Sequence, residues 1–155
     1  MKHFFSKLMT VASMCIALTS TRLSAQSNQY LDFDGTDDYV NVPNASQVIA
    51  GSNAFSITGW FYDNALGYGQ GMMGFRATAG GFYMIQLNTG SIECRFLNSA
   101  GTLYQYVAPN YTTVPQVWQH FAWIYNRSAI SLYVNGNLSG SSPASGNITN
   151  TAISF

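Results

Sequence analysis

Ionisable side chains are scarce in this sequence. Only 8% of the 155 residues are charged, and the chain contains six Lys or Arg, six Asp or Glu and two His. A zinc centre needs several His or Cys ligands, and a nucleic-acid surface needs a cluster of Lys and Arg. The composition therefore argues against both kinds of site.

An apolar run long enough to cross a membrane is missing near the N-terminus. The largely apolar run there, residues 8–18, has 11 residues, whereas a spanning helix needs about 20. The run follows a basic start with Lys2 and Lys7 and precedes a polar stretch that ends at Ala25. This is the pattern of an export signal. We expect residues 1–25 to be a signal peptide, no transmembrane segment, and a secreted protein outside the cell or at its surface.

The remaining part, residues 26–155, has the size of one domain and a small negative charge. It contains three Arg and six acidic residues, so its formal charge is 3 − 6 = −3. We therefore expect neither nucleic acid nor an anionic membrane surface as a partner. Cys94 is the one cysteine in this part and cannot form an internal disulfide. Because Cys94 alternates with Ile92 and Phe96, we expect it to be a buried apolar side chain.

Helical spacing is also lacking, whereas aromatic residues, Gly, Ser, Asn and Thr are abundant. Short alternating runs between turn residues are typical of strands. The expected strands are residues 30–34, 39–42, 55–62, 82–87, 91–97, 103–107, 119–126 and 130–134. The pair Asn135-Gly136 indicates a tight hairpin. Many short strands at even spacing predict an all-β fold, either an antiparallel sandwich or a barrel.

Residues 65–81 interrupt the strand pattern with six glycines. We expect a long loop or an irregular edge strand there. The stretch from Gly69 to Gly74 matches the glycine spacing of a dinucleotide-binding loop. That loop must lead directly into a helix whose N-terminus holds the pyrophosphate. Because strands are expected to follow these glycines, we reject a dinucleotide site.

Four stretches occur in the order found in one known family. They are residues 33–40 (FDGTDDYV), 55–60 (FSITGW), 118–125 (WQHFAWIY) and 132–136 (LYVNG). Through them the chain resembles the laminin-G-like (LamG) branch of the concanavalin A-like lectin/glucanase superfamily over nearly all of residues 30–155. The resemblance implies an antiparallel two-sheet jelly-roll sandwich. It also implies an incomplete domain, because relatives continue beyond a segment like residues 152–155 into a closing strand.

The resemblance implies a secreted, non-catalytic binding module, with carbohydrate as the first expected ligand and an extracellular protein as the second. The module would serve in adhesion or as part of a larger extracellular protein. The alternatives are a glycoside hydrolase of the same superfamily and a purely structural or degenerate fragment. A hydrolase needs two carboxylic acids beside the scissile bond. Residues 26–155 contain one Glu, Glu93, without the partner acids of related glucanases, so we expect no enzyme.

Four of the six acidic residues lie together in the stretch LDFDGTDDYV, at Asp32, Asp34, Asp37 and Asp38. Their spacing does not fit an EF-hand loop, which needs Gly at the sixth position and Glu at the twelfth. Asp is also favoured in turns, because its carboxylate accepts hydrogen bonds from nearby backbone amides. We expect a turn between two strands. If a metal binds, the cofactor is calcium and its ligands are Asp34, Asp37 and Asp38.

The carbohydrate site is expected where aromatic residues mix with Asn and Asp, because sugar C–H faces pack on aromatic rings. The expected ligand-binding residues are Tyr62, Asp63, Asn64, Tyr68 and Tyr111. Other aromatic residues are expected to fill the sandwich, namely Phe55, Trp60, Trp118, Phe121 and Trp123. We expect His120 to be a structural histidine, hydrogen-bonded within the sandwich, since no Gly-x-Ser-x-Gly elbow accompanies it.

Overall fold

A computed structural model describes residues 29–66, 69–77, 80–109 and 111–149. The chain divides between Asn41 and Val42 into two compact units. The expected signal peptide, residues 1–25, lies outside the described residues. None of the helices described is both long and apolar enough to cross a membrane.

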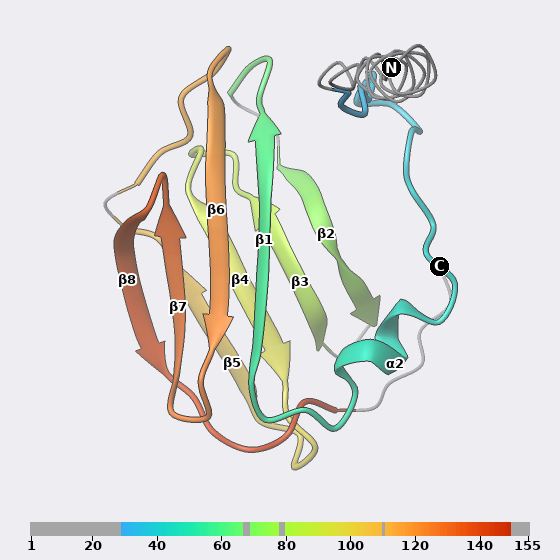
Figure 1. The fold of residues 1–155 in the computed structure, drawn as a ribbon, viewed down its shortest axis with the longest axis vertical. Helices are drawn as coiled ribbons and strands as arrows, with labels where there is room; N and C mark the ends of the chain where they lie inside the picture. The colour runs from blue at the N-terminus through green and yellow to red at the C-terminus, as the bar shows by residue number, and fades with distance from the viewer. Residues whose placement is uncertain (1–28, 67–68, 78–79, 110, 150–155) are drawn as a thin grey trace, which may run out of the picture. The chain divides into compact units, whose positions relative to one another are not determined.

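The second unit contains two antiparallel sheets of four strands each, with the orders β1-β6-β7-β8 and β2-β3-β4-β5 (Figure 1). The strands are β1 (Phe55–Tyr62), β2 (Gln70–Ala77), β3 (Gly80–Gln86), β4 (Ile92–Leu97), β5 (Leu103–Val107), β6 (Trp118–Tyr125), β7 (Ala129–Val134) and β8 (Asn137–Pro143). A short helix, α2 (Ala45–Ile49), precedes β1. The expected all-β fold with two antiparallel sheets is confirmed.

The hydrophobic core lies between the two sheets, and aromatic rings from both of them fill it. Trp123 of β6 is fully buried, and its ring stacks on that of Phe82 in β3 with the centroids 4.4 Å apart. The ring of Phe55 in β1 meets Trp123 edge-on at 4.9 Å. Edge-to-face and offset-stacked pairs are the favourable arrangements for aromatic quadrupoles. Stacking across the two sheets therefore holds them together.

Cys94 lies in this core, as its alternation in β4 predicts. Its side chain is fully buried. Burial raises the pKa of the Cys94 thiol, and the neighbouring Glu93 carboxylate raises it further. A thiol that remains protonated is a poor nucleophile, so Cys94 serves packing.

Most strands of the sandwich lie where the sequence predicts them. β1 and β5 have the expected bounds, and β3, β4, β6 and β7 differ by one or two residues. The glycine-rich segment contains β2, an edge strand whose register shifts between Gly71 and Met73. The irregular edge strand is thus confirmed, and no helix follows its glycines. β8 was not expected, although the hairpin turn before it was; Asn135 and Gly136 have φ angles of 49° and 79°.

One expectation is corrected near the boundary of the two units, because residues 29–42 form no strand. Two side chains close a turn in this segment instead. Asp34 Oδ1 accepts a hydrogen bond from the Thr36 amide at 2.8 Å, and Asp38 Oδ2 accepts one from the Asp34 amide at 3.0 Å. An alternating pattern alone does not make a strand, because strand amides need a neighbouring strand to bond. The expected turn is present, but the two flanking strands are not.

Candidate functional site

Two pairs of side chains form a row on the outer face of the sheet that contains β1 and β6. Trp60 lies directly opposite His120, and Tyr62 lies directly opposite Trp118 in the antiparallel register. Residues two apart in a strand point to the same side, so all four side chains share one face. We call these four residues the aromatic strip.

The rings of the aromatic strip are in contact within each of the two pairs, and three of them are open to solvent. Trp60 and His120 have ring centroids 5.1 Å apart, and Tyr62 and Trp118 have centroids 5.5 Å apart. Trp60 is 65% exposed, Trp118 44% and Tyr62 43%. Aromatic rings of this size normally become buried when a protein folds or binds. Three such rings in one exposed row mark a surface for contact with another molecule.

Among the described strand residues of this sheet, the outward positions beside the aromatic strip carry no formal charge. The outward positions on β1, β6 and β7 beside the strip hold small, aliphatic or phenolic side chains, namely Ser56, Thr58, Ala122, Ile124, Ser131 and Tyr133. Asp63 follows directly after Tyr62 but is only 4% exposed. The surface is therefore suited to a neutral ligand rather than to an ionic one.

A buried polar network fixes the end of the strip at Tyr62 and Trp118. Asp63 Oδ2 accepts a hydrogen bond from Gln86 Nε2 at 2.6 Å and one from Thr113 Oγ1 at 3.3 Å. Gln86 Nε2 also donates to Thr113 Oγ1 at 2.7 Å, and the Gln116 amide donates to the Asp63 carbonyl at 2.7 Å. Because Gln86 ends β3, the network ties the end of β1 to the opposite sheet.

The strip changes several assignments that were made from the sequence. Trp60 and Trp118 were expected to fill the core, which is wrong, whereas Phe55, Phe121 and Trp123 do pack in it. The ring of His120 lies against Trp60 on the outer face, not within the sandwich. The alternation of side chains along β1 and β6 explains these positions. Phe61 and Phe121 point inward, so their neighbours Trp60 and His120 point outward.

The expected ligand-binding residues do not all lie together on one surface. Tyr62 belongs to the aromatic strip, and Asn64 is exposed nearby in sequence. Asp63 lies inside the protein, with both carboxylate oxygens engaged. Tyr68 lies outside the described residues. Of the five expected residues, Tyr62 and Asn64 are thus described as exposed.

Tyr111, the fifth of these residues, packs against the core and is half-buried. Its hydroxyl donates a hydrogen bond to Gln119 Oε1. Gln119 is 1% exposed, and its amide group also donates to the Val114 carbonyl at 3.0 Å. The contacts of Tyr111 therefore position the segment before β6, next to the strip.

The buried phenol of Tyr111 should make the free energy of unfolding depend on pH. Burial raises the pKa of Tyr111 to about 12, from an ordinary value of 10.0. The unfolded chain then loses the phenolic proton before the folded chain does, so the free energy of unfolding falls as the pH rises from about 10 to about 12. Burial also raises the pKa values of Tyr125 and Cys94, which act in the same direction. We expect Tyr111→Phe to reduce this slope in urea unfolding; an unchanged slope would contradict the role of Tyr111.

The carboxylates of Asp34, Asp37 and Asp38 lie close enough together to hold one cation. One oxygen from each lies within 4.8 Å of the others, and all three residues are exposed. Calcium takes six to eight oxygen ligands, often including backbone carbonyls and water. Three carboxylates fit part of such a set. The hydrogen bonds from Thr36 and Asp34 to these side chains also account for the cluster as a turn.

Glu93 lies on the face of β4 opposite Cys94, and it is buried rather than free at the surface. Its side chain is paired with Arg95, whose Nη1 is 3.5 Å from Glu93 Oε1. Tyr83 donates a hydrogen bond to the same oxygen at 3.3 Å, and the Arg95 guanidinium lies 4.1 Å from the centre of the Tyr83 ring. The Glu93 carboxylate is thus held by contacts with Arg95 and Tyr83.

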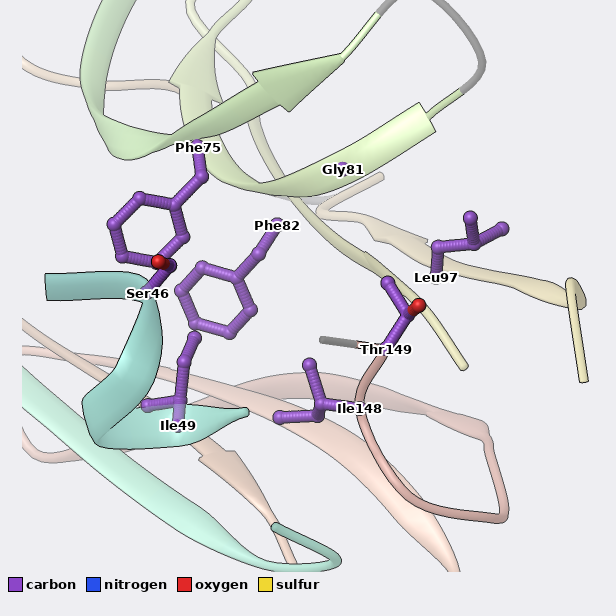
Figure 2. A pocket seen from close by; sticks show the side chains of 8 residues that line it. All are labelled: Ser46, Ile49, Phe75, Gly81, Phe82, Leu97, Ile148 and Thr149. Carbon is purple, nitrogen blue, oxygen red and sulfur yellow. The ribbon is translucent and has the colours of Figure 1, made fainter. Parts of the chain in front are cut away.

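An apolar groove of about 470 Å³ opens beside β1 and β2. Its lining includes Phe55 and Ile57 of β1, Met73 of β2, and Val48 of α2. A separate cavity of about 10 Å³ lies nearby, among Ile49, Phe75, Phe82, Ile148 and Thr149 (Figure 2). The cavity has about the volume that one water needs, and its lining is mostly apolar. The groove has a much larger volume than this cavity, and it lies at the margin of the core.

Comparison with known proteins identifies the family. A laminin G family model, described as the concanavalin A-like lectin/glucanases superfamily, matches residues 34–155. The chain therefore belongs to this superfamily, as the four sequence stretches indicate. No curated protein matches the chain.

Among solved structures, the chain is similar to the binding domain of Paraclostridial Mosquitocidal Protein 1. The TM-score is 0.52 at 16% sequence identity, and the match covers 66% of this chain and 29% of the other. At this identity the similarity concerns the fold alone. This chain matches less than a third of the length of that structure.

Proposed function

We propose that the domain is a non-catalytic carbohydrate-binding module and that the aromatic strip is its binding surface. The observation that carries the proposal is the exposure of Trp60, Tyr62 and Trp118 in one row on the outer face of the sheet. Pyranose rings have C–H faces that pack on Trp and Tyr, and hydrogen bonds from the rim fix their orientation. The solved neighbour of the same fold is itself a binding domain, which supports a binding role.

The ligand class that fits the strip is an uncharged polysaccharide. The side chains around it are neutral, and the strip spans two strands rather than enclosing a pocket. A row of exposed rings can contact successive sugar units of an extended chain. An acidic glycan would find no cation among the outward residues that neighbour the strip.

We further infer that the module does not hydrolyse its ligand and that it acts outside the cell after export. Hydrolysis requires two carboxyl groups, roughly 5 Å apart for retention and farther for inversion. Glu93 is held by Arg95 and Tyr83, and Asp63 by Gln86 and Thr113. The export-type N-terminal sequence and the laminin G family support an extracellular location.

Binding to a panel of glycans, together with co-sedimentation on insoluble neutral polysaccharides, tests the proposed function. We expect binding to neutral glycans that resists added salt, because the contacts are apolar. Release of reducing sugars during the incubation would overturn the non-catalytic assignment. Binding confined to acidic glycans and abolished by salt would overturn the strip as the surface.

We propose that Asp34, Asp37 and Asp38 bind a calcium ion. We expect calcium binding and glycan binding to be independent of each other. Calcium should raise the melting temperature of the wild-type protein relative to chelator, because an ion that binds the folded form stabilises it. The shift should disappear in Asp37→Asn/Asp38→Asn, whereas Asp32→Asn serves as the matched control. Equal melting temperatures with calcium and with chelator would contradict the proposal.

A further inference from the structure

The turn that precedes β6 contains a residue in an unfavourable backbone conformation. Gln116 follows Pro115 in this turn and has a φ angle of 60°. Among the described residues, the other non-glycine residues with positive φ are Asn44, Asn135 and Arg127. Asn adopts this conformation comparatively easily, whereas Gln and Arg do so rarely. Gly or Asn is favoured at a turn position of this kind after proline, so the Gln116 side chain is destabilising there.

Hydrogen bonds on both sides of Gln116 impose this conformation. The Gln116 amide donates to the Asp63 carbonyl at 2.7 Å. The side chain of Gln119 accepts a hydrogen bond from the Val114 amide at 3.1 Å, and it donates to the carbonyls of Val114 at 3.0 Å and Val117 at 3.4 Å. Backbone strain persists where the surrounding contacts impose it, and it is concentrated at functional sites. The backbone of Gln116 is therefore held in place before any ligand binds.

Gln116 lies beside the ring pair of Tyr62 and Trp118. Its hydrogen-bond partner Asp63 directly follows Tyr62, and Gln116 itself precedes Trp118 by two residues. The two rings lie opposite each other where β1 ends and β6 begins, at the same end of the sheet (Figure 1). Gln116 is exposed, and its side-chain amide makes no hydrogen bond within the described part of the chain. A neutral group with donors and an acceptor thus adjoins the aromatic strip.

We propose that Gln116 is a specificity-determining residue of the aromatic strip, whose side-chain amide hydrogen-bonds the hydroxyl groups of a neutral sugar stacked on Tyr62 and Trp118. This inference rests on the proposed function. An amide offers two donors and an acceptor, so it can engage two neighbouring hydroxyl groups of one pyranose. Stacking on the rings accepts many sugars, because they share apolar C–H faces, whereas hydrogen bonds depend on the direction of each hydroxyl group. Gln116 therefore selects among the sugars that the rings alone would accept.

The residue type at position 116 favours a role in binding over a role in the turn alone. A turn that only connected β5 to β6 would be more stable with Gly at this position, because Gly adopts positive φ without a steric cost. Gln occupies the position at lower stability and supplies an amide that Gly lacks. A loss of stability of this kind is typical of sites where function and stability conflict.

Gln116→Gly separates binding from stability, because it removes the amide and the backbone strain together. Titration calorimetry with soluble hexasaccharides of glucose, of mannose and of galactose measures the affinity, and thermal unfolding measures the stability. We expect Gln116→Gly to lose about five- to tenfold in affinity for the preferred hexasaccharide, as for one lost hydrogen bond. The variant should also discriminate less among the three sugars. Its melting temperature should equal or exceed that of the wild-type protein.

Arg127→Gly is the matched control for Gln116→Gly. Arg127 also has a positive φ, of 78°, but it lies beyond the opposite end of β6 from Trp118. The substitution therefore relieves the same kind of backbone strain away from the aromatic strip. Arg127→Gly should bind all three hexasaccharides as the wild-type protein does.

Two results would overturn the role of Gln116. The first is wild-type affinity and wild-type discrimination in Gln116→Gly, which would make Gln116 a residue of the turn alone. The second is a loss of affinity that accompanies a lower melting temperature or that occurs equally in Arg127→Gly. Either result would leave the proposed function intact, provided that the wild-type protein binds. A wild-type protein that binds none of the three hexasaccharides would overturn the proposed function as well.

Discussion

Trp60→Ala/Trp118→Ala is expected to lose about a hundredfold in affinity for a neutral polysaccharide. A ring stacked on a partner contributes about 0.5–1.5 kcal/mol beyond burial, and about 1.4 kcal/mol corresponds to a tenfold change in affinity. Two rings that contact different sugar units should act nearly independently. Each single variant should therefore lose about tenfold, as measured by titration calorimetry with a soluble oligosaccharide.

The fold should survive these substitutions, because both rings are largely exposed. Exposed substitutions usually change the free energy of unfolding by less than about 0.5 kcal/mol, which urea unfolding can check. Leu138→Ala is the matched control, since Leu138 is 56% exposed on β8 but lies outside the strip. If Tyr68→Ala abolishes binding while both tryptophan variants bind normally, the ligand binds at Tyr68 and not on the strip.

Trp123→Ala should have the largest effect on stability. The Trp123 side chain is fully buried and contacts Phe82 of the opposite sheet and Phe55 of the neighbouring strand β1. Replacing a buried Trp by Ala leaves a cavity and typically costs about 3–5 kcal/mol, a large fraction of the stability of a domain of this size. Urea unfolding should show a much lower midpoint or no folded baseline.

Trp118→Ala is the natural control for Trp123→Ala, because it removes the same side chain from the same strand. Trp118 faces solvent and Trp123 faces the core. The two variants should differ by several kcal/mol in the free energy of unfolding. A loss of less than about 1 kcal/mol for Trp123→Ala would contradict the packing described for the core.

Sequence reasoning predicted the sandwich well because its strands carry local information. Alternation in β1 and in β4 to β7 marks each strand, and Asn135-Gly136 marks a hairpin through the positive φ angles of both residues. β8 was not predicted from the sequence, because it consists mainly of Ser and Gly and shows no alternation of apolar side chains. The strands expected within residues 30–42 failed for the opposite reason, since a good local pattern does not supply a neighbouring strand.

The candidate site was only partly predictable. Tyr62 was selected for its residue type, and it does lie on the exposed face. Trp60 and Trp118 were assigned to the core by size, although their parity relative to Phe61 and Phe121 already placed them outside. The burial of Asp63 could not be foreseen, because its partners Gln86 and Thr113 are distant in sequence and meet it only through the packing of the sheets.

The polar network next to Tyr62 and Trp118 has a consequence for the entropy of binding. Hydrogen bonds from Gln86 and Thr113 to Asp63 join the end of β1 to the opposite sheet. The backbone that carries Tyr62 is therefore held in place before a ligand binds. A ligand then has little backbone to order when it binds, and the entropic cost of association is small. Less of the free energy from shallow surface contacts is then spent on ordering the protein.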